Sequence, residues 1–288
     1  VTKYVFSELL LKLFTEQGVP IIDEDLVIAK NIIGRGSSGR IYEGRYDNKA
    51  VVIKEIELDS NDRPDVFEEF CKDINTIYRT QHEMLPKLHG VMFEKSESSS
   101  VNLVYEFVDG KPLKEACIGK DDKEKFEIIF QLCKLLDFLH SKKLIHRNIK
   151  PSKIMVENGE RIRIKLLDFR IPKMKFQRNR FTQLSLGNTA YLAPECFDVD
   201  LDSSSEEIML ITGKVDIWAV GTLTSEIFSG GVVPWSNKCK NTLSIEIKLV
   251  NKKPFPIPEG VKNDYALKVI KAACVIDQRE RASAKDIM

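Results

Sequence analysis

The chain has 288 residues, of which 43% are hydrophobic and 30% charged. This length fits one large domain or two lobes, and the balance excludes an intrinsically disordered chain. Lys and Arg number 44 against 43 Asp and Glu, which gives a net charge of +1. This near balance argues against electrostatic attraction of the protein surface as a whole to nucleic acid or to a membrane. Without a signal peptide or an apolar run that could span a bilayer, the sequence predicts a cytoplasmic protein, a nuclear location being the alternative.

The six cysteines are widely spaced and form neither a metal-ligand pattern nor a compact disulfide framework, so we expect reduced thiols. They are Cys71, Cys117, Cys133, Cys196, Cys239 and Cys274. The chain begins at Val1 and stops at Met288 within a helical pattern, which favours an excised domain of a longer protein.

The first 25 residues predict an amphipathic helix and a linker. Apolar residues recur at helical spacing across residues 5–14, and Gly18 and Pro20 provide a stop signal. The favoured interpretation is that the apolar stripe packs on the domain's own surface. The alternative is a helix that binds a partner or forms a homodimer.

From Leu26 onward, short β-branched runs separated by turn residues predict antiparallel strands. A glycine-rich segment, residues 34–41 (GRGSSGRI), lies between two of them, and a strand containing Lys54 follows. Glycines of this kind let backbone amides approach phosphates, and a lysine adds a positive charge. An ordinary hairpin turn and a solvated lysine are the alternatives.

Further helices are predicted over residues 64–78 and 123–141. The second has a broad apolar face that we assign to the core, formed by Phe126, Ile129, Phe130, Cys133, Leu136 and Leu139. A strand is expected over residues 101–105 and another over residues 163–167. An acidic, serine-rich insertion follows at residues 201–207.

The loop after the second of these helices, residues 146–155 (HRNIKPSKIM), closely resembles the catalytic loop of eukaryotic protein kinases. Other kinase-like motifs occur in the family's order: the glycine-rich segment, Lys54, Asp168-Phe169-Arg170, Ala193-Pro194-Glu195, Asp216 in DIWAVG, Pro234-Trp235 and Arg281. The resemblance covers about residues 26–288. It is greatest to the tyrosine-kinase-like branch, although Lys150 is typical of Ser/Thr kinases.

The resemblance implies an α+β, two-lobed protein kinase-like fold. A small, mainly antiparallel β lobe with one main helix would span residues 26–106, and the hinge with a large, mainly helical lobe would span residues 107–288. Arg281 would pair with Glu195. The resemblance also implies a nucleotide site formed by Gly34, Gly36, Gly39, Ile41, Val52, Lys54, Asp73, Tyr105, Glu106, Val108, Met155 and Leu167.

Within that site, Asp73 occupies the position of the acid that pairs with the strand lysine, and Glu69 is the alternative partner. Both could instead be exposed helix acids. The backbone of Glu106 and Val108 would meet an adenine edge. Asp216 would brace the catalytic loop.

Several positions depart from the family pattern. Asn148 stands where kinases have the catalytic Asp, Lys153 where they have a metal-binding Asn, and Arg170 where they have the glycine of the Asp-Phe-Gly motif. Asn188 replaces a threonine that contacts the catalytic Asp. These replacements, with the metal ligand Asp168 retained, suggest a pseudokinase with one magnesium site or none.

We therefore expect an allosteric or scaffolding module that is read by a protein partner or a neighbouring domain. A weakly active Ser/Thr kinase and a nucleotide-sensing switch are the alternatives. ATP binding stays open, because Lys153 could neutralise phosphate while Val52 and Met155 narrow the adenine slot. Phosphorylation of Thr182 or Ser185, captured by Arg147, would be the regulatory event.

Overall fold

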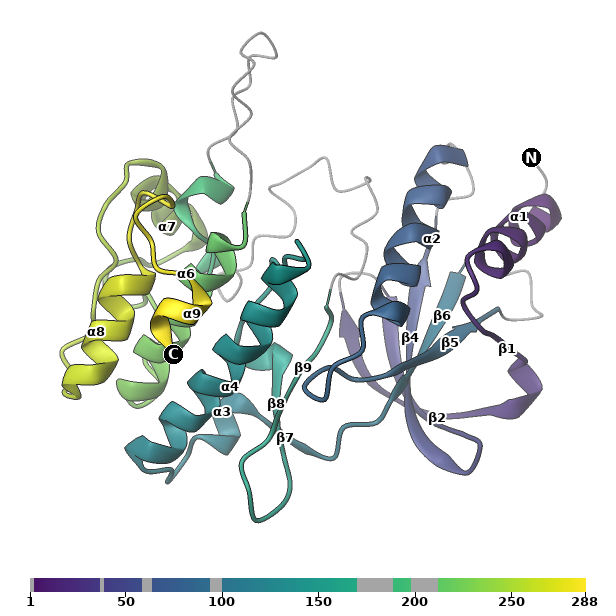
Figure 1. Ribbon diagram of the computed structural model, residues 1–288, viewed down its shortest axis with the longest axis horizontal. Coiled ribbons are helices and arrows are strands. Elements are labelled where there is room, and N and C mark those ends of the chain that lie inside the picture. Colours follow the sequence, from purple (N-terminus) through teal and green to yellow (C-terminus); the bar gives the residue numbers. More distant parts are fainter. Residues whose placement is uncertain (1–2, 37–38, 59–63, 94–99, 170–188, 198–211) are drawn as a thin grey trace, which may run out of the picture. The chain divides into compact units, whose positions relative to one another are not determined.

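The computed structural model describes residues 3–36, 39–58, 64–93, 100–169, 189–197 and 212–288 (Figure 1). The chain divides into two compact units. The first comprises Val1–Asp109 with Phe169–Gln183, and the second comprises Gly110–Asp168 with Leu184–Met288. The first unit is mainly β-sheet and the second mainly helical, which confirms the predicted two-lobed kinase-like fold class.

The first unit contains a six-stranded sheet in the order β1-β5-β6-β4-β3-β2. Its strands are β1 (Ile21–Ile22), β2 (Val27–Gly36), β3 (Gly39–Tyr46), β4 (Lys49–Glu57), β5 (Leu88–Met92) and β6 (Ser100–Glu106). All neighbours are antiparallel except β1 and β5, which run parallel. Asp47 and Asn48 join β3 to β4 with φ of 50° and 58°, as expected of a tight hairpin that favours these residue types.

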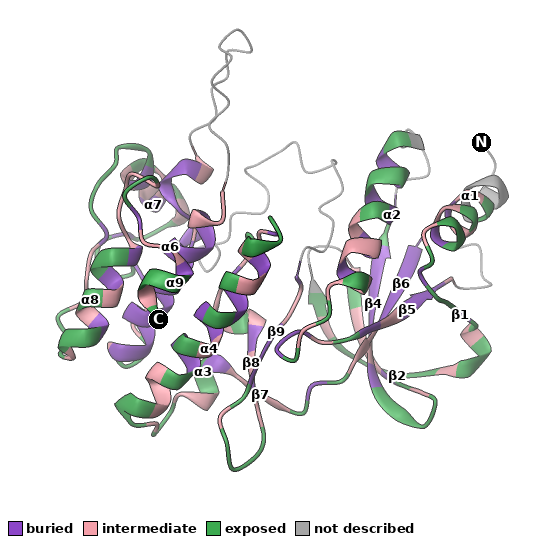
Figure 2. Cartoon of the chain, viewed as in Figure 1, coloured by how far each residue is buried: buried purple, intermediate pink, exposed green. Residues whose placement is uncertain are grey.

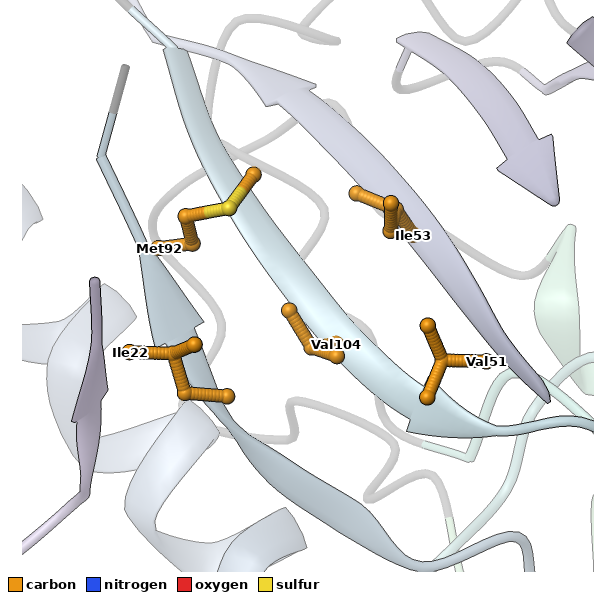
Figure 3. Packing of buried hydrophobic residues seen from close by; sticks show 5 residues of the cluster. All are labelled: Ile22, Val51, Ile53, Met92 and Val104. Carbon is orange, nitrogen blue, oxygen red and sulfur yellow. The ribbon is translucent and has the colours of Figure 1, made fainter. Parts of the chain in front are cut away.

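One face of this sheet carries a small apolar cluster (Figure 3). Ile22, Val51, Ile53, Met92 and Val104 are all buried and come from β1, β4, β5 and β6. Alternate residues of a strand point to opposite faces, so Val51 and Ile53 share the face opposite to Val52 and Lys54. The cluster thereby fixes the face of the sheet to which Lys54 belongs.

Two helices pack together in the first unit, α1 (Lys3–Glu16) and α2 (Pro64–Arg79). Phe14 of α1 is fully buried and makes an edge-to-face contact with Phe70 of α2, the ring centroids being 6.1 Å apart. The guanidinium of Arg79 also donates to the carbonyl of Gln17 at 3.3 Å. The prediction that the N-terminal helix packs on the domain's own surface is thus confirmed.

The second unit begins with a three-stranded sheet in the order β7-β8-β9. Its strands are β7 (Gly110–Pro112), β8 (Ile154–Glu157) and β9 (Ile164–Leu166). The helices are α3 (Leu113–Ala116), α4 (Asp122–Ser141), α6 (Lys214–Phe228), α7 (Thr242–Val250), α8 (Asp264–Ala273) and α9 (Ala284–Ile287). Single 3-10 turns occur at η1 (Glu24–Leu26), η2 (Pro151–Lys153) and η4 (Pro194–Cys196).

Helix α6 is the centre of the second unit, because every residue from Val215 to Phe228 is buried (Figure 2). Helix α4 begins with a capping box between Asp121 and Glu124 and buries one face. The prediction for α4 was wrong at Phe130, whose side chain is 46% exposed. The buried stripe is centred on Ile128, Leu132 and its neighbours, which turns Phe130 toward solvent.

All six cysteines are free. Burial raises the pKa of the Cys71 and Cys133 thiols to about 12 and that of Cys117 to about 11, so these three thiols stay protonated at neutral pH. Among the residues that the structure describes, no helix has both the length and the apolar character needed to cross a membrane.

Candidate functional site

The predicted site residues fall on both units, and those of the first unit cluster on β3, β4 and β6. Ile41 lies directly opposite Lys54, and Val52 lies directly opposite Tyr105. Directly opposite residues of antiparallel strands share a face, so these four side chains lie on one face of the sheet. Lys54 is only 7% exposed. This register brings together the residues predicted to surround the base and phosphates of a nucleotide.

The glycines of segment 34–41 have different surroundings. Gly39 has φ of +147°, and a Cβ added there would lie 2.3 Å from the carbonyl oxygen of Glu55. Among the residues that the structure describes, a Cβ at Gly34 would meet Ile41 alone, at 3.8 Å. Gly36 ends β2 and pairs with Gly39. Packing of the backbone therefore requires glycine at position 39, while space remains beside position 34.

An ion pair that sequence analysis missed lies beside Lys54. The guanidinium of Arg40 donates to both carboxylate oxygens of Glu55, at 2.7 and 3.0 Å, and the Tyr42 hydroxyl donates at 3.3 Å. Glu55 is 3% exposed, and its bond to Arg40 lowers the pKa of the carboxyl. The sequence contained a signal for this pair, because Arg40 directly follows Gly39 of the glycine-rich segment and Glu55 directly follows Lys54. The pair joins the glycine-rich segment to β4 at the residue after Lys54.

Helix α2 carries the two acids proposed as partners of Lys54. Asp73 is half-buried and Glu69 is exposed. Which of them pairs with Lys54 stays a prediction.

Two hydrogen bonds hold Glu106 at the end of β6. The Glu106 carboxylate accepts the N–H of Lys87 at 3.0 Å, and the Glu106 N–H donates to the Lys87 carbonyl at 2.9 Å. These bonds fasten the strand that leads to Val108, which is buried.

In the second unit, Asp216 of α6 organises the loop that follows α4. Its carboxylate is 1% exposed and accepts the N–H groups of His146 and Arg147 at 2.9 and 2.8 Å. It also bonds Nε2 of His140 at 2.9 Å. Arg147 has φ of +64°, which is uncommon for a residue other than glycine. Two of these three bonds hold the loop backbone in place, and the third joins the same buried carboxylate to α4.

His146 connects that loop to the end of β9. Its Nδ1 accepts the Asn148 N–H at 3.2 Å, so Nε2 carries the proton and donates to the Leu167 carbonyl at 3.1 Å. The ring is 3% exposed, and burial lowers its pKa. A neutral imidazole thus joins the backbone at Asn148 to the backbone just before Asp168.

An ion pair joins Lys153 to Asp168, the residue predicted to hold metal. The Lys153 ammonium binds Oδ2 of Asp168, and the two side chains are 21% and 17% exposed. The Leu167 N–H also donates to the Lys153 carbonyl at 2.7 Å, which fixes the two segments side by side. The charge of Lys153 lies on the carboxylate predicted to hold metal, and the neutralisation of phosphate by Lys153 stays a prediction.

Two residues predicted at the metal-ligand positions of the kinase family thus bind each other. Magnesium prefers oxygen ligands, and an ammonium group cannot coordinate a cation. Here Lys153, at the position predicted for the second ligand, supplies such a group and binds one oxygen of Asp168. Among the described residues, no three His, Cys, Asp or Glu side chains are grouped so as to hold a metal ion.

Glu195 and Arg281 form the predicted ion pair. The guanidinium of Arg281 donates to both carboxylate oxygens, at 2.6 and 3.0 Å, and the side chains are 0% and 4% exposed. Its remaining N–H groups donate to the carbonyls of Val275, Lys214 and Ile276. The expectation for this pair is confirmed, and it anchors the end of the segment that follows Asp168.

Other predicted residues are placed less tightly. Asn148, Lys150 and Met155 are half-buried in the second unit, Met155 lying on β8 opposite Lys165. The Lys153 N–H donates to the Lys150 carbonyl at 2.9 Å. Arg170, Thr182, Ser185 and Asn188, and the insertion at residues 201–207, lie outside the described residues.

Comparison with known proteins matches residues 27–288 to the protein kinase domain family. Mitogen-activated protein kinase kinase 7 of Arabidopsis thaliana is 26% identical over 221 residues, 75% of this chain and 69% of the relative. Mitogen-activated protein kinase kinase 9 of the same plant is 26% identical over 200 residues, 69% of this chain and 62% of the relative. RasGEF domain-containing serine/threonine-protein kinase X of Dictyostelium discoideum is 30% identical over 203 residues, 65% of this chain and 20% of the relative.

Proposed function

Since the chain belongs to the protein kinase domain family, we propose that it is a pseudokinase module, which signals through its conformation and transfers phosphate weakly or not at all. The observation that carries the proposal is the ion pair between Lys153 and Asp168. It gives the carboxylate a protein cation as its counter-ion, where the family uses a metal. A metal that binds through Oδ2 of Asp168 would have to displace this ammonium.

The residue at the catalytic position supports the same proposal. An amide cannot accept a proton as a carboxylate does, so Asn148 lacks a contribution of about 10²–10⁴-fold in rate. Its backbone is nevertheless held by His146. The loop thus keeps the support of a catalytic loop without the general base.

We propose that a nucleotide, if bound, is held without a divalent cation. Lys54 and the glycines at positions 34, 36 and 39 would meet the phosphates, and ATP would supply a phosphate chain for these groups to recognise. Binding of this kind suits a nucleotide-sensing switch. The signal would be read by a protein partner or a neighbouring domain of the same polypeptide, in the cytoplasm.

The test is the melting temperature of the chain with ATP, in magnesium and in chelator. For the native chain we expect the same stabilisation in both buffers. For Lys153→Asn, which frees one Asp168 oxygen and supplies an amide oxygen ligand, we expect greater stabilisation in magnesium than in chelator. A native chain that ATP stabilises only in magnesium would overturn the proposed exclusion of metal.

A weakly active Ser/Thr kinase is the second candidate. Lys54 and Asp168 are retained, and the relatives carry the names of protein kinases. Transfer of radiolabelled γ-phosphate to a generic protein substrate tests this candidate, with Asp168→Ala as the control. Transfer by the native chain that disappears in the control would favour the enzyme. Equal signals from both proteins would eliminate it.

Regulation by phosphorylation remains part of the proposal. Arg147 is exposed and could capture a phosphate placed on Thr182 or Ser185. Mass spectrometry of protein from its native cells tests this idea, and the absence of both modifications would count against it.

A further inference from the structure

A surface hollow in the second unit lies beside α7. Its volume is about 500 Å³, and its apolar walls include Trp235, Ile247, Phe255 and Ile257. A space of this size accommodates one large side chain together with some neighbouring peptide.

Helix α7 continues the apolar surface beyond the hollow. Its side chains Leu243, Ile247 and Val250 are 59%, 52% and 51% exposed. They are spaced four and three residues apart, so they lie along one face, while Ile245 and Leu249 are buried on the other. A helix that is apolar on its outer face as well as its inner face is typical of a surface that binds a partner.

The charged residues that line the hollow are all lysines. Lys238, Lys248 and Lys253 line it together with Asn251, and none of the ten lining residues is acidic. The chain as a whole has a net charge of only +1, so the lining of the hollow is more positive than the chain as a whole. Its complement is a segment that carries carboxylates beside an apolar side chain.

The wall of the hollow is built from a strained and incompletely satisfied residue. Trp235 is 3% exposed and has φ of +68°, an outlier for a bulky side chain. Its buried indole N–H finds no hydrogen-bond partner in the described part of the chain. Residues in such conformations persist where the surrounding structure holds them, and they cluster at functional sites.

That surrounding structure connects the hollow to the ion pair at Glu195. Trp235 meets Phe255 edge to face at 5.8 Å, and Phe255 meets Trp218 edge to face at 6.0 Å. Arg281 lies over the Trp218 ring at 5.2 Å and binds Glu195. These packed rings make the wall rigid, so a ligand would meet a preformed surface.

We propose that the hollow and the outer face of α7 bind a short acidic peptide segment of a partner protein. A leucine or phenylalanine side chain of the peptide fills the hollow, and flanking carboxylates pair with Lys238, Lys248 and Lys253. This surface would be where the module meets its partner. The proposal does not depend on nucleotide binding or on phosphate transfer, so its failure and theirs are distinguishable.

The probe is a fluorescent synthetic peptide with one phenylalanine between runs of glutamate, titrated with the native chain and followed by fluorescence anisotropy. Ile247→Ser and Lys248→Glu should each weaken binding by about tenfold or more. The matched controls are Ile118→Ser, at a side chain 80% exposed, and Lys240→Glu, an exposed lysine that does not line the hollow. Both controls should bind as the native chain does.

Replacing the phenylalanine of the peptide by serine should also weaken binding by about tenfold. Equal weakening by Lys240→Glu and Lys248→Glu would show attraction to charge alone and overturn the proposal. Undetectable binding of the peptide would overturn it as well. Oleate, a fatty acid, serves as the competing probe. If oleate binds, Ile247→Ser abolishes that binding and the peptide stays unbound, the hollow takes a lipid and the proposal is overturned. All substituted side chains are at the surface. Melting temperatures will verify folding, and Lys253→Glu provides an independent variant.

Discussion

Arg281 donates through two nitrogens to both carboxylate oxygens of Glu195, at 2.6 and 3.0 Å, in surroundings that leave the two side chains 0% and 4% exposed. Breaking a buried ion pair on one side leaves an uncompensated charge, which typically costs about 3–5 kcal/mol. We expect Glu195→Gln to lower the free energy of unfolding by about 3 kcal/mol, measured by urea denaturation. The comparison is Arg279→Ala, which removes an exposed pair with Asp277 and should have no measurable effect. Equal effects of the two substitutions would contradict the role given to burial.

Gly39 and Gly34 offer a way to separate a structural role from a role in nucleotide binding. Gly39→Ala should lower the free energy of unfolding by about 2 kcal/mol or more, because its Cβ would lie 2.3 Å from a backbone oxygen. Gly34→Ala should change it by less than about 0.5 kcal/mol. If ATP stabilises the native chain and the amides near position 34 approach its phosphates, Gly34→Ala should reduce that stabilisation. Similar losses of stability for the two variants would show that the described packing is not what requires glycine.

The contact between α1 and α2 predicts that the N-terminal helix stabilises the first unit. Phe14 is fully buried between Phe70 and Phe93, and truncation of such a ring costs about 3–5 kcal/mol. Phe14→Ala should therefore lower the urea midpoint strongly. Lys12→Ala, on the same helix with a side chain 72% exposed, should leave it unchanged. An unaffected midpoint in Phe14→Ala would mean that α1 contributes no stability.

Burial of His146 predicts a dependence of stability on pH. The folded-state pKa lies below the ordinary value of 6.5, so the unfolded state binds the proton more readily. The contribution is fully present above pH 6.5 and decreases as pH falls through the folded-state pKa. Urea denaturation from about pH 7.5 to about pH 5.5 should show this loss, and His146→Asn should show less of it.

His89 must be considered in that experiment, since burial lowers its pKa as well. It contributes in the same direction and over the same range of pH. His89→Asn is therefore the companion variant, and its loss of pH dependence should add to that of His146→Asn. A pH dependence that is unchanged in both variants would assign the effect to other groups.

Much of this architecture was predictable because the kinase-like motifs each meet a different physical need and occur in one order. The strands of the first unit other than β1, its helix α2 and the pairing of Arg281 with Glu195 were expected from the sequence pattern and that order. The roles of Asn148, Lys54 and Asp73 in a nucleotide site remain predictions. A single sequence says which residue types are present, but a role requires a bound nucleotide or a measured rate.

Other features could not be derived, because they depend on contacts between distant segments. Strand β1 has only two residues, which is too short for any periodic pattern. Lys153 and Asp168 are 15 residues apart, and only the folded chain shows that the ammonium binds the carboxylate. The exposure of the apolar outer face of α7 could not be predicted from the sequence, because apolar residues on both sides of a helix normally predict burial.

Strand β1 also determines where this protein can be shortened. Ile21 and Ile22 pair with Val91 and Met92 along the outer side of β5, and the Val91 N–H donates to the Pro20 carbonyl at 2.9 Å (Figure 1). The opposite edge strand, β2, has two register shifts, and irregularities of this kind discourage pairing with another molecule. Within the described part of the chain, β1 is the strand that pairs with β5 on that side. The family match begins at residue 27, so a protein produced from that boundary would expose β5 as a template for intermolecular strand pairing and should aggregate.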